Sequence, residues 1–195
     1  MLTIIMGKSC SGKNTAVDEL IKKKFKPIVT YTSRPRRRGE REGREYHYIT
    51  QEDFADKIKG GLFAEWKSYD VDGETWYYGS PLEEIVDASR DDKNHVIILT
   101  PQGVVDVLDI LNRHFSDCKV KVIYLYANRA TILKRFKARK DKNDTIERRM
   151  KADDNDFKNA VNIANKIVYN NNGEDIKAVA NKIIKYVNER GCGMD

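Results

Sequence analysis

The sequence predicts an α/β fold built on a mainly parallel sheet of five strands that helices flank. Two observations support this prediction. Apolar runs that suit buried strands alternate along the chain with stretches of helical periodicity, which is the order that βαβ units require. The first such run, Leu2 to Met6, also leads through the glycine-bounded segment 7–12 straight into a helical pattern.

The first part of the chain is predicted to hold one helix of the main fold and then a small insert. Ala16, Leu20 and Ile21 lie at helical spacing behind the glycine-bounded segment, so a helix follows it directly. The other elements expected here are strands at 27–31, 46–49, 62–69 and 75–78 and a helix that begins after Thr50 and ends at Gly60. The last two strands flank a short turn, which breaks the alternation and indicates a small mixed or antiparallel unit.

The second part of the chain returns to alternating strands and helices. Val96 to Leu99 is a continuous apolar run, which is typical of a strand that is buried on both faces. The other elements expected are strands at 120–126 and 167–169 and helices after Ser80-Pro81, over 103–111, over 130–140, from 145 onward and over 175–189. Together with 2–6 and 27–31, these strands complete the predicted five-stranded sheet.

Length and charge narrow the classes of function. A chain of 195 residues fits one domain, and 36 Lys and Arg against 30 Asp and Glu give a net charge of +6. The basic segments 34–44 and 134–149 suit either nucleic acid or several phosphates on small molecules, and the glycine-bounded loop favours small molecules. No apolar run reaches membrane-spanning length, no secretory signal is visible, and three cysteines lack metal-ligand spacing. We therefore expect a reduced, cytoplasmic protein that binds neither membrane nor nucleic acid.

The segment after the first strand has the spacing of a phosphate-binding P-loop, Gly-x-x-x-x-Gly-Lys. Glycines let the backbone wrap an anion with its N–H groups, the following helix adds its positive end, and Lys13 adds a full charge. The alternative is a chance turn between a strand and a helix. The residues predicted to bind ATP here are Gly7, Lys8, Ser9, Cys10, Ser11, Gly12, Lys13, Asn14 and Thr15.

A second constellation gives the sequence a family resemblance. The arginine-rich segment 30–46, the segment Phe63-Ala64-Glu65-Trp66 and the segment Tyr77-Tyr78-Gly79-Ser80 follow the P-loop in order. Together they resemble guanylate kinase over nearly the whole chain. The resemblance implies a P-loop kinase that converts ATP and GMP to ADP and GDP. It further implies a core of 1–29, 81–128 and 146–195, a lobe for the nucleoside monophosphate (NMP) at 30–80, and a helical lid at 129–145.

The arginines of the segment 30–46 suit an acceptor phosphate. Two phosphate-bearing substrates repel each other, so cations must supply the countercharge. Arg34 and Arg37 resemble the family's acceptor-phosphate clamp, because their forked donors match phosphate oxygens. The resemblance adds hydroxyl donors from Thr30, Tyr46 and Tyr78. The alternative for the arginines is a solvated loop, and for Tyr78 a packed aromatic side chain.

The base of the acceptor is expected to meet Glu65. The resemblance makes Glu65 the carboxylate that accepts from the guanine N1–H and amino groups, with Ser80 on the base edge and Thr100 facing the same site. Adenine lacks that donor pair and would leave a buried Glu65 unpaired. The alternative is that Glu65 is a solvated strand residue.

The resemblance also assigns residues around ATP in the second half of the chain. Arg135 and Arg139 lie four apart on one helical face and match the family's lid pattern, and Arg149 matches an arginine near the transferring phosphoryl group. Asn170 falls where the family contacts adenine, although a loop cap after a strand explains it equally well. The predicted catalytic residues are Lys13, Arg34, Arg135, Arg139 and Arg149.

Two features depart from the family pattern. Asn14 stands where a hydroxyl usually binds Mg²⁺, although its amide oxygen is also a possible ligand. Ile98 and Thr100 stand where the family usually has aspartates, one that supports the lysine and metal and one that faces the nucleotide site. We expect Mg²⁺ with ATP, an NMP acceptor, GMP or dGMP above others, and a monomer or homodimer. A kinase with another acceptor and a nucleotide-binding module with little catalysis are the alternatives.

Overall fold

The computed structural model describes residues 1–71, 73–139 and 146–189, and the side chains of Arg139 and 147–149 lie outside this description. The main sheet has five strands in the order β2–β7–β1–β8–β9, and every neighbouring pair is parallel, as predicted. These strands are β1 (Leu2–Met6), β2 (Lys26–Pro27), β7 (His95–Ile98), β8 (Val120–Tyr126) and β9 (Lys166–Tyr169).

The central strand, β1, divides the core into two layers. All five of its residues are buried. Leu2, Ile4 and Met6 contribute to one apolar cluster and Ile5 to the other, because successive side chains of a strand point to opposite faces. A strand that is apolar on both sides is typical of a sheet covered by helices on both faces.

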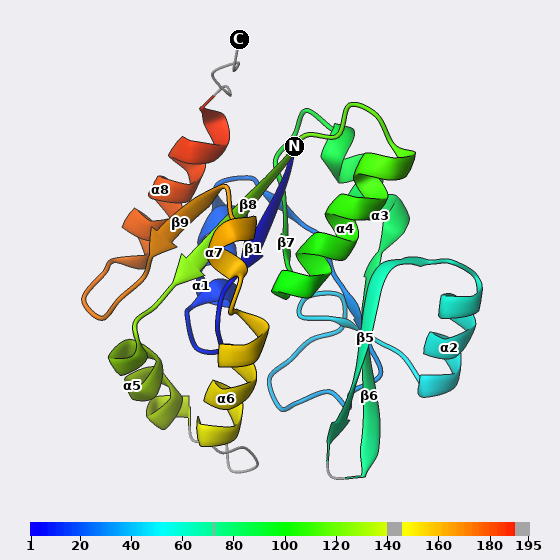
Figure 1. Cartoon of the computed structure of the whole chain (residues 1–195), viewed down its shortest axis with the longest axis horizontal. Coiled ribbons are helices and arrows are strands. Elements are labelled where there is room, and N and C mark those ends of the chain that lie inside the picture. The colour runs from blue at the N-terminus through cyan, green and yellow to red at the C-terminus, as the bar shows by residue number, and fades with distance from the viewer. Residues whose placement is uncertain (72, 140–145, 190–195) are drawn as a thin grey trace.

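Helices cover the two faces of the main sheet (Figure 1). One apolar cluster includes residues of α1 (Lys13–Lys22) and α8 (Ile176–Asn188), and the other includes residues of α3 (Leu82–Arg90), α4 (Pro101–His114) and α7 (Ala160–Ile163). The helix α4 starts at an N-cap, Thr100, whose hydroxyl accepts from the Gly103 N–H at 3.1 Å.

The insert forms a second, mixed sheet in the order β4–β3–β6–β5. Its strands are β3 (Tyr31–Thr32), β4 (His47–Tyr48), β5 (Phe63–Val71) and β6 (Glu74–Pro81). The first two pair in parallel, whereas β6 is antiparallel to both β3 and β5. The helix α2 (Gln51–Lys59) starts at the predicted N-cap, Thr50, and its Phe54 stacks on Phe63 and Tyr77.

The prediction of one strand over 27–31 is wrong. The segment contributes Pro27 to β2 of the main sheet and Tyr31 to β3 of the second sheet, so the chain changes sheets within it. Ile28 still donates its N–H to Val96 of β7 at 2.9 Å, whereas Thr30 accepts from the His47 N–H at 2.9 Å. The short helix α7 was also not predicted, because four residues are too few to show a period.

The remaining helices stand near the carboxyl ends of the parallel strands. In Figure 1, α5 (Arg129–Arg139), α6 (Ile146–Asp156), the end of β5 and the start of β6 all lie on the lower side of the molecule, to which β1 and β8 point. Loops at the carboxyl ends of the strands are where open α/β sheets bind ligands. Among the described residues, none of the helices is both long and apolar enough to cross a membrane.

Candidate functional site

The loop between β1 and α1 has the geometry of an anion-binding loop. Gly12, at the N-cap of α1, adopts a left-handed conformation with φ of 94°, which a side chain would strain. The Lys13 ammonium turns back over the loop and donates to the backbone oxygens of Gly7 and Lys8 at 2.6 and 3.1 Å. A helix N-terminus beside a cation attracts phosphate oxygens, as the sequence predicts for residues 7–15.

Two predicted nucleotide-site residues brace this loop. Arg135 of α5 donates through Nη1 to the Ser11 carbonyl at 3.0 Å and to the Cys10 carbonyl at 3.3 Å. Asn170 is 2% exposed and donates through Nδ2 to the same Ser11 carbonyl at 2.7 Å, and its Oδ1 accepts from Arg135 at 3.2 Å. Burial lowers the pKa of the Arg135 guanidinium. In this conformation both side chains hold the outer turn of the loop.

Two acidic residues of α6 that the sequence reasoning missed also contact the loop. The Asp153 carboxylate accepts from the Ser9 N–H at 2.8 Å and from the Ser9 hydroxyl at 3.3 Å, and Asp154 pairs with Lys8. The partners of the first contact are 144 positions apart, so no local pattern in the sequence announces it. These contacts attach α6 to the loop.

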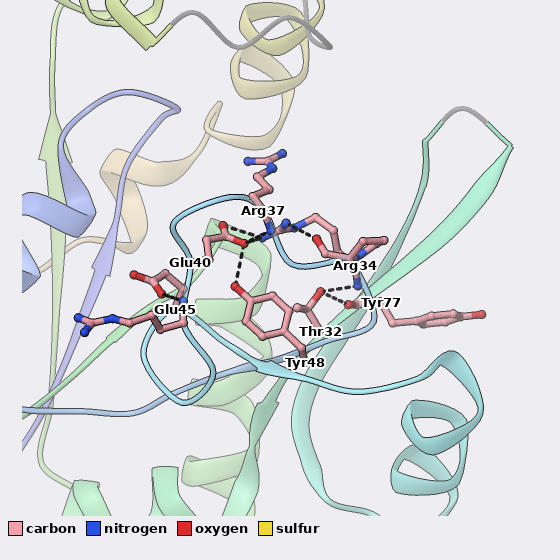
Figure 2. A network of polar contacts seen from close by, with 9 residues as sticks. Thr32, Arg34, Arg37, Glu40, Glu45, Tyr48 and Tyr77 are labelled. Atoms are coloured by element: carbon pink, nitrogen blue, oxygen red, sulfur yellow. Dashed lines mark hydrogen bonds and ion pairs between the residues drawn. The ribbon is translucent and has the colours of Figure 1, made fainter.

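The arginine loop, residues 33–46, is built around an ion pair. Arg34 is only 4% exposed, and its Nη2 donates to both carboxylate oxygens of Glu40 at 2.9 Å. The same carboxylate accepts from the Arg37 N–H at 2.8 Å. Figure 2 shows the Arg37 side chain pointing away from this network, and that side chain is exposed. The two predicted clamp arginines therefore differ: one is buried in an ion pair and the other is accessible.

Two tyrosine rings lie against the buried arginine, and a third packs on one of them. The Arg34 guanidinium lies over the rings of Tyr46 and Tyr48, at 5.6 and 5.9 Å from their centroids. Tyr46 also contacts the ring of Tyr78 edge-on at 5.8 Å, and burial raises the pKa of Tyr46. The structure thus brings together Arg34, Tyr46 and Tyr78, three of the residues predicted to hold the acceptor. Thr30 is half-buried in the chain segment that leads to β3.

The predicted base-binding residues also converge. The Glu65 carboxylate, on β5, accepts from the Ser80 hydroxyl at 2.5 Å, and Ser80 is 1% exposed. This carboxylate approaches the start of α4 so closely that a Cβ atom added to Gly103 would lie 3.1 Å from Glu65 Oε2. Burial raises the pKa of Glu65, although Ser80 opposes the rise. Thr100 lies at the same helix end, but its hydroxyl is engaged as the N-cap.

A cavity of about 380 Å³ adjoins this end of the site. Its lining includes Lys67 of β5, Thr100 and Gln102 at the start of α4, and Asn155 and Asp156 at the end of α6. Because β5 side chains alternate, Lys67 lies on the same face of the strand as Glu65. The cavity is large enough to admit part of a nucleotide and has polar groups along its walls.

The comparison that decides the family is a match of the guanylate kinase family model to residues 1–186. The chain belongs to the guanylate kinase family. The guanylate kinase of Clostridium tetani (strain Massachusetts / E88) is 33% identical over 108 residues, which cover 55% of this chain and 50% of that protein. The guanylate kinase of Oleidesulfovibrio alaskensis is 31% identical over 153 residues, covering 77% of this chain and 70% of that protein.

The chain thus spans about half the length of several curated guanylate kinases that it matches. Among solved structures, guanylate kinase from Anaplasma phagocytophilum superposes with a TM-score of 0.70 at 19% identity, over 96% of this chain and 84% of that one. An uncharacterized protein from Eubacterium ventriosum gives a TM-score of 0.54 at 12% identity, over 97% and 99% of the two chains. These likenesses support the P-loop α/β fold.

Some predicted site residues fall outside the gathered groups. Asn14 and Thr15 have exposed side chains at the start of α1. Arg139 ends α5 and Arg149 lies within α6, but both side chains lie outside the described part of the chain. Ile98, where the family usually has an aspartate, is the last residue of β7 and is half-buried.

Proposed function

We propose that this member of the guanylate kinase family transfers the γ-phosphoryl group of ATP to GMP. The observation that carries the proposal is the half-buried Glu65 carboxylate, which accepts from Ser80 at the N-terminus of α4 in a chain whose first strand leads into a glycine-bounded loop. Guanine offers a carboxylate two adjacent donors, N1–H and the 2-amino group. Adenine offers no such pair and would leave this carboxylate unpaired.

The residues of the proposed site act mainly by position and charge. Residues 7–15 would bind the ATP phosphates through backbone N–H groups, and Lys13 would turn from its loop carbonyls to the outer phosphates. The exposed Arg37 would meet the acceptor phosphate, with Arg34, Tyr46 and Tyr78 beside it. Phosphoryl transfer needs little covalent help from the protein, so this alignment of two phosphates supplies the catalysis.

Mg²⁺ is part of the proposal. Within the described ranges, no three His, Cys, Asp or Glu side chains gather as a metal-binding group. Mg²⁺ commonly takes one or two protein oxygens and completes its shell with phosphates and water, so the exposed amide of Asn14 suits a metal carried mainly by ATP. When bound, the metal neutralises charge on the phosphates.

We also propose how the chain divides into core, lobe and lid, and where the protein acts. We assign the core to 1–29, 81–128 and 146–195, the NMP lobe to 30–80 and the lid to 129–145, of which 140–145 lie outside the described residues. Lobe and lid would close on the two substrates and exclude water from the reacting phosphates. We place the protein in the cytoplasm as a monomer or homodimer whose partners are ATP and the acceptor.

The experiment that tests the proposal is a coupled assay of ADP release with ATP, Mg²⁺ and a panel of acceptors: GMP, dGMP, IMP, AMP and UMP. We expect kcat/KM to be highest for GMP or dGMP. A site built to bind two donors rejects an analogue that lacks them by about 10⁴-fold, so AMP should be a very poor acceptor. Equal or better turnover of AMP or UMP would contradict the guanine assignment.

A kinase with another acceptor is the second candidate, on one observation. Thr100, where the family usually has an aspartate, offers no carboxylate to the base and uses its hydroxyl to cap α4. The same panel tests this candidate, which requires a monophosphate other than GMP or dGMP to give the highest kcat/KM. A chain that binds ATP but phosphorylates none of the panel would instead be a nucleotide-binding module.

A further inference from the structure

The Glu40 carboxylate is the centre of the polar network in the arginine loop (Figure 2). Both of its oxygens accept from Arg34 Nη2 at 2.9 Å. Oε2 also accepts from the Arg37 N–H and from the Tyr48 hydroxyl, each at 2.8 Å. One carboxylate therefore joins two arginines and Tyr48 of β4 in a single hydrogen-bonded unit.

The arginine loop depends on this unit because regular structure contributes little to it. No helix or named strand lies between Thr32, the end of β3, and His47, the start of β4. The backbone hydrogen bonds inside the loop are few and local, such as Glu40 N to the Arg37 carbonyl at 3.2 Å. Side-chain contacts must therefore fix where the two arginines stand.

Glu40 contacts the two arginines in different ways, one through its side chain and the other through its backbone. The Arg34 side chain is buried, with Nη1 on the Pro35 carbonyl at 2.7 Å and its face over the tyrosine rings. A buried guanidinium without a counter-ion is strongly destabilising, and Glu40 supplies that counter-ion. Arg37, in contrast, is held by its backbone N–H, which leaves its guanidinium exposed.

We propose that Glu40 is a positioning residue for the acceptor-phosphate site: it holds Arg34 in place and presents Arg37 to the phosphate. This inference rests on the proposed function. Two cations that must meet one phosphate repel each other before it binds, and a nearby carboxylate offsets that repulsion. The loop is then preorganised for the phosphate without Glu40 having to touch it.

The ionisation of Glu40 agrees with this role. Burial by itself would raise the pKa of Glu40, but hydrogen bonds from the Arg37 N–H, Tyr48 and Arg34 outweigh it and hold the pKa below its usual value. The carboxylate is therefore ionised at neutral pH, as an arginine partner requires.

The test compares Glu40→Gln with Glu42→Gln. Glu42 lies on the same loop, is largely exposed, and accepts from His47 and from the Tyr48 N–H, but it does not contact either arginine. We expect Glu40→Gln to raise the KM for GMP about 10- to 100-fold, since hydrogen bonds to charged groups are at stake. The KM for ATP should stay within about twofold, and Glu42→Gln should resemble the unmodified protein in both.

Two further variants keep the test decisive if Glu40→Gln folds poorly. Glu40→Asp keeps the charge with a shorter reach and should recover part of the GMP affinity. Tyr48→Phe removes one hydrogen bond to the same carboxylate and should raise the KM for GMP less than Glu40→Gln does. Calorimetric titration adds a readout of phosphate recognition itself: the variants should lose affinity for GMP while their affinity for guanosine is unchanged.

The outcomes separate this inference from the proposed function. If the unmodified chain phosphorylates GMP but Glu40→Gln leaves the KM for GMP unchanged, only the role of Glu40 is overturned. The same holds if Glu42→Gln raises that KM equally, or if GMP and guanosine affinities fall together, because the effect would then be general loop stability. An unmodified chain that phosphorylates no monophosphate overturns both.

Discussion

The P-loop, residues 7–15, and the arginine loop, residues 33–46, are both assigned to phosphate, yet they are built differently. The P-loop would bind phosphate through main-chain N–H groups, and it is braced by residues distant in sequence, such as Asn170, which is 159 positions from Ser11. The arginine loop presents side-chain cations and is held by neighbours within eight positions, through Glu40. One site depends on the fold around it and the other on the charge of a single carboxylate.

Because of this difference, we expect the two sites to lose function through different kinds of change. A backbone cradle is sensitive to added atoms and to backbone strain, because its ligand groups cannot move independently of the chain. A loop of paired charges is sensitive to neutralisation, by mutation or by protonation. A variant that breaks one of the two loops should leave the other intact, so the second loop serves as its internal control.

The largest effect is expected for Lys13→Met. The ammonium is the full charge that the P-loop adds to its backbone donors, and loss of one such group at a reacting centre costs about 10²–10³-fold in kcat. Steady-state kinetics with ATP and GMP measure it. Lys22→Met, at the exposed far end of the same helix, is the control and should leave kcat unchanged. A Lys13→Met enzyme with normal kcat would remove the P-loop from the mechanism.

The next effect is expected for Arg37→Ala. A charge-assisted contact with phosphate is worth about 1.5–3 kcal/mol, so kcat/KM for the acceptor should fall about 10- to 100-fold. The KM for ATP should not change, because the P-loop is untouched. Arg38→Ala, which removes the adjacent exposed arginine, is the matched control. If both variants lose acceptor affinity equally, the loop attracts phosphate only through its net charge.

A glycine pair tests the backbone side of the comparison. Gly12 and Gly39 both have positive φ, 94° and 90°. A Cβ atom at Gly12 would stand 2.4 Å from Nδ2 of the buried Asn170, whereas at Gly39 it would meet nothing within 4 Å. We expect Gly39→Ala to cost about 1 kcal/mol of unfolding free energy and Gly12→Ala about 3 kcal/mol, since strain alone costs 1–3. Urea unfolding of both variants measures the difference. Equal losses of unfolding free energy would show that the Asn170 side chain moves away from the added Cβ atom at little cost.

The smallest effect concerns pH. The folded pKa of Glu40 lies below its usual value of 4.5, so its contribution to stability is present above that value and is lost as pH falls through the folded pKa. The folded pKa of Glu65 is raised, so protonation stabilises the fold relative to its state at neutral pH. Unfolding free energies between pH 7 and about pH 3 should therefore show Glu40→Gln converging on the unmodified protein as pH falls. As pH falls over the same range, the unmodified protein should become more stable relative to the Glu65→Gln variant. If the pH profile of either variant runs parallel to that of the unmodified protein, the pKa shift of that residue is contradicted.

The sequence by itself determined the elements and motifs whose geometry depends on neighbours along the chain. The predicted strand Val120–Tyr126 has the same bounds as β8. Thr50 caps α2 as predicted, and the glycine spacing located the P-loop. Period, capping and turn chemistry act over a few residues, so they can be read directly. The same local reading gave one strand for 27–31, because nothing in those residues records that the chain leaves one sheet and joins another.

The tertiary structure alone decided which side chains share a site. Glu65 and Ser80 were predicted together through a family resemblance, but their place at the N-terminus of α4 comes from the fold. Asp153 accepts from Ser9, and Asn170 donates to the Ser11 carbonyl, across separations of 144 and 159 positions that no window of sequence spans. The role of Glu40 was not predicted for another reason. In the sequence, an acidic residue among arginines is typical of a solvated loop, and only the burial of Arg34 shows that this arginine needs Glu40 as its counter-ion. Contacts of these kinds depend on topology and burial, which only the folded chain defines.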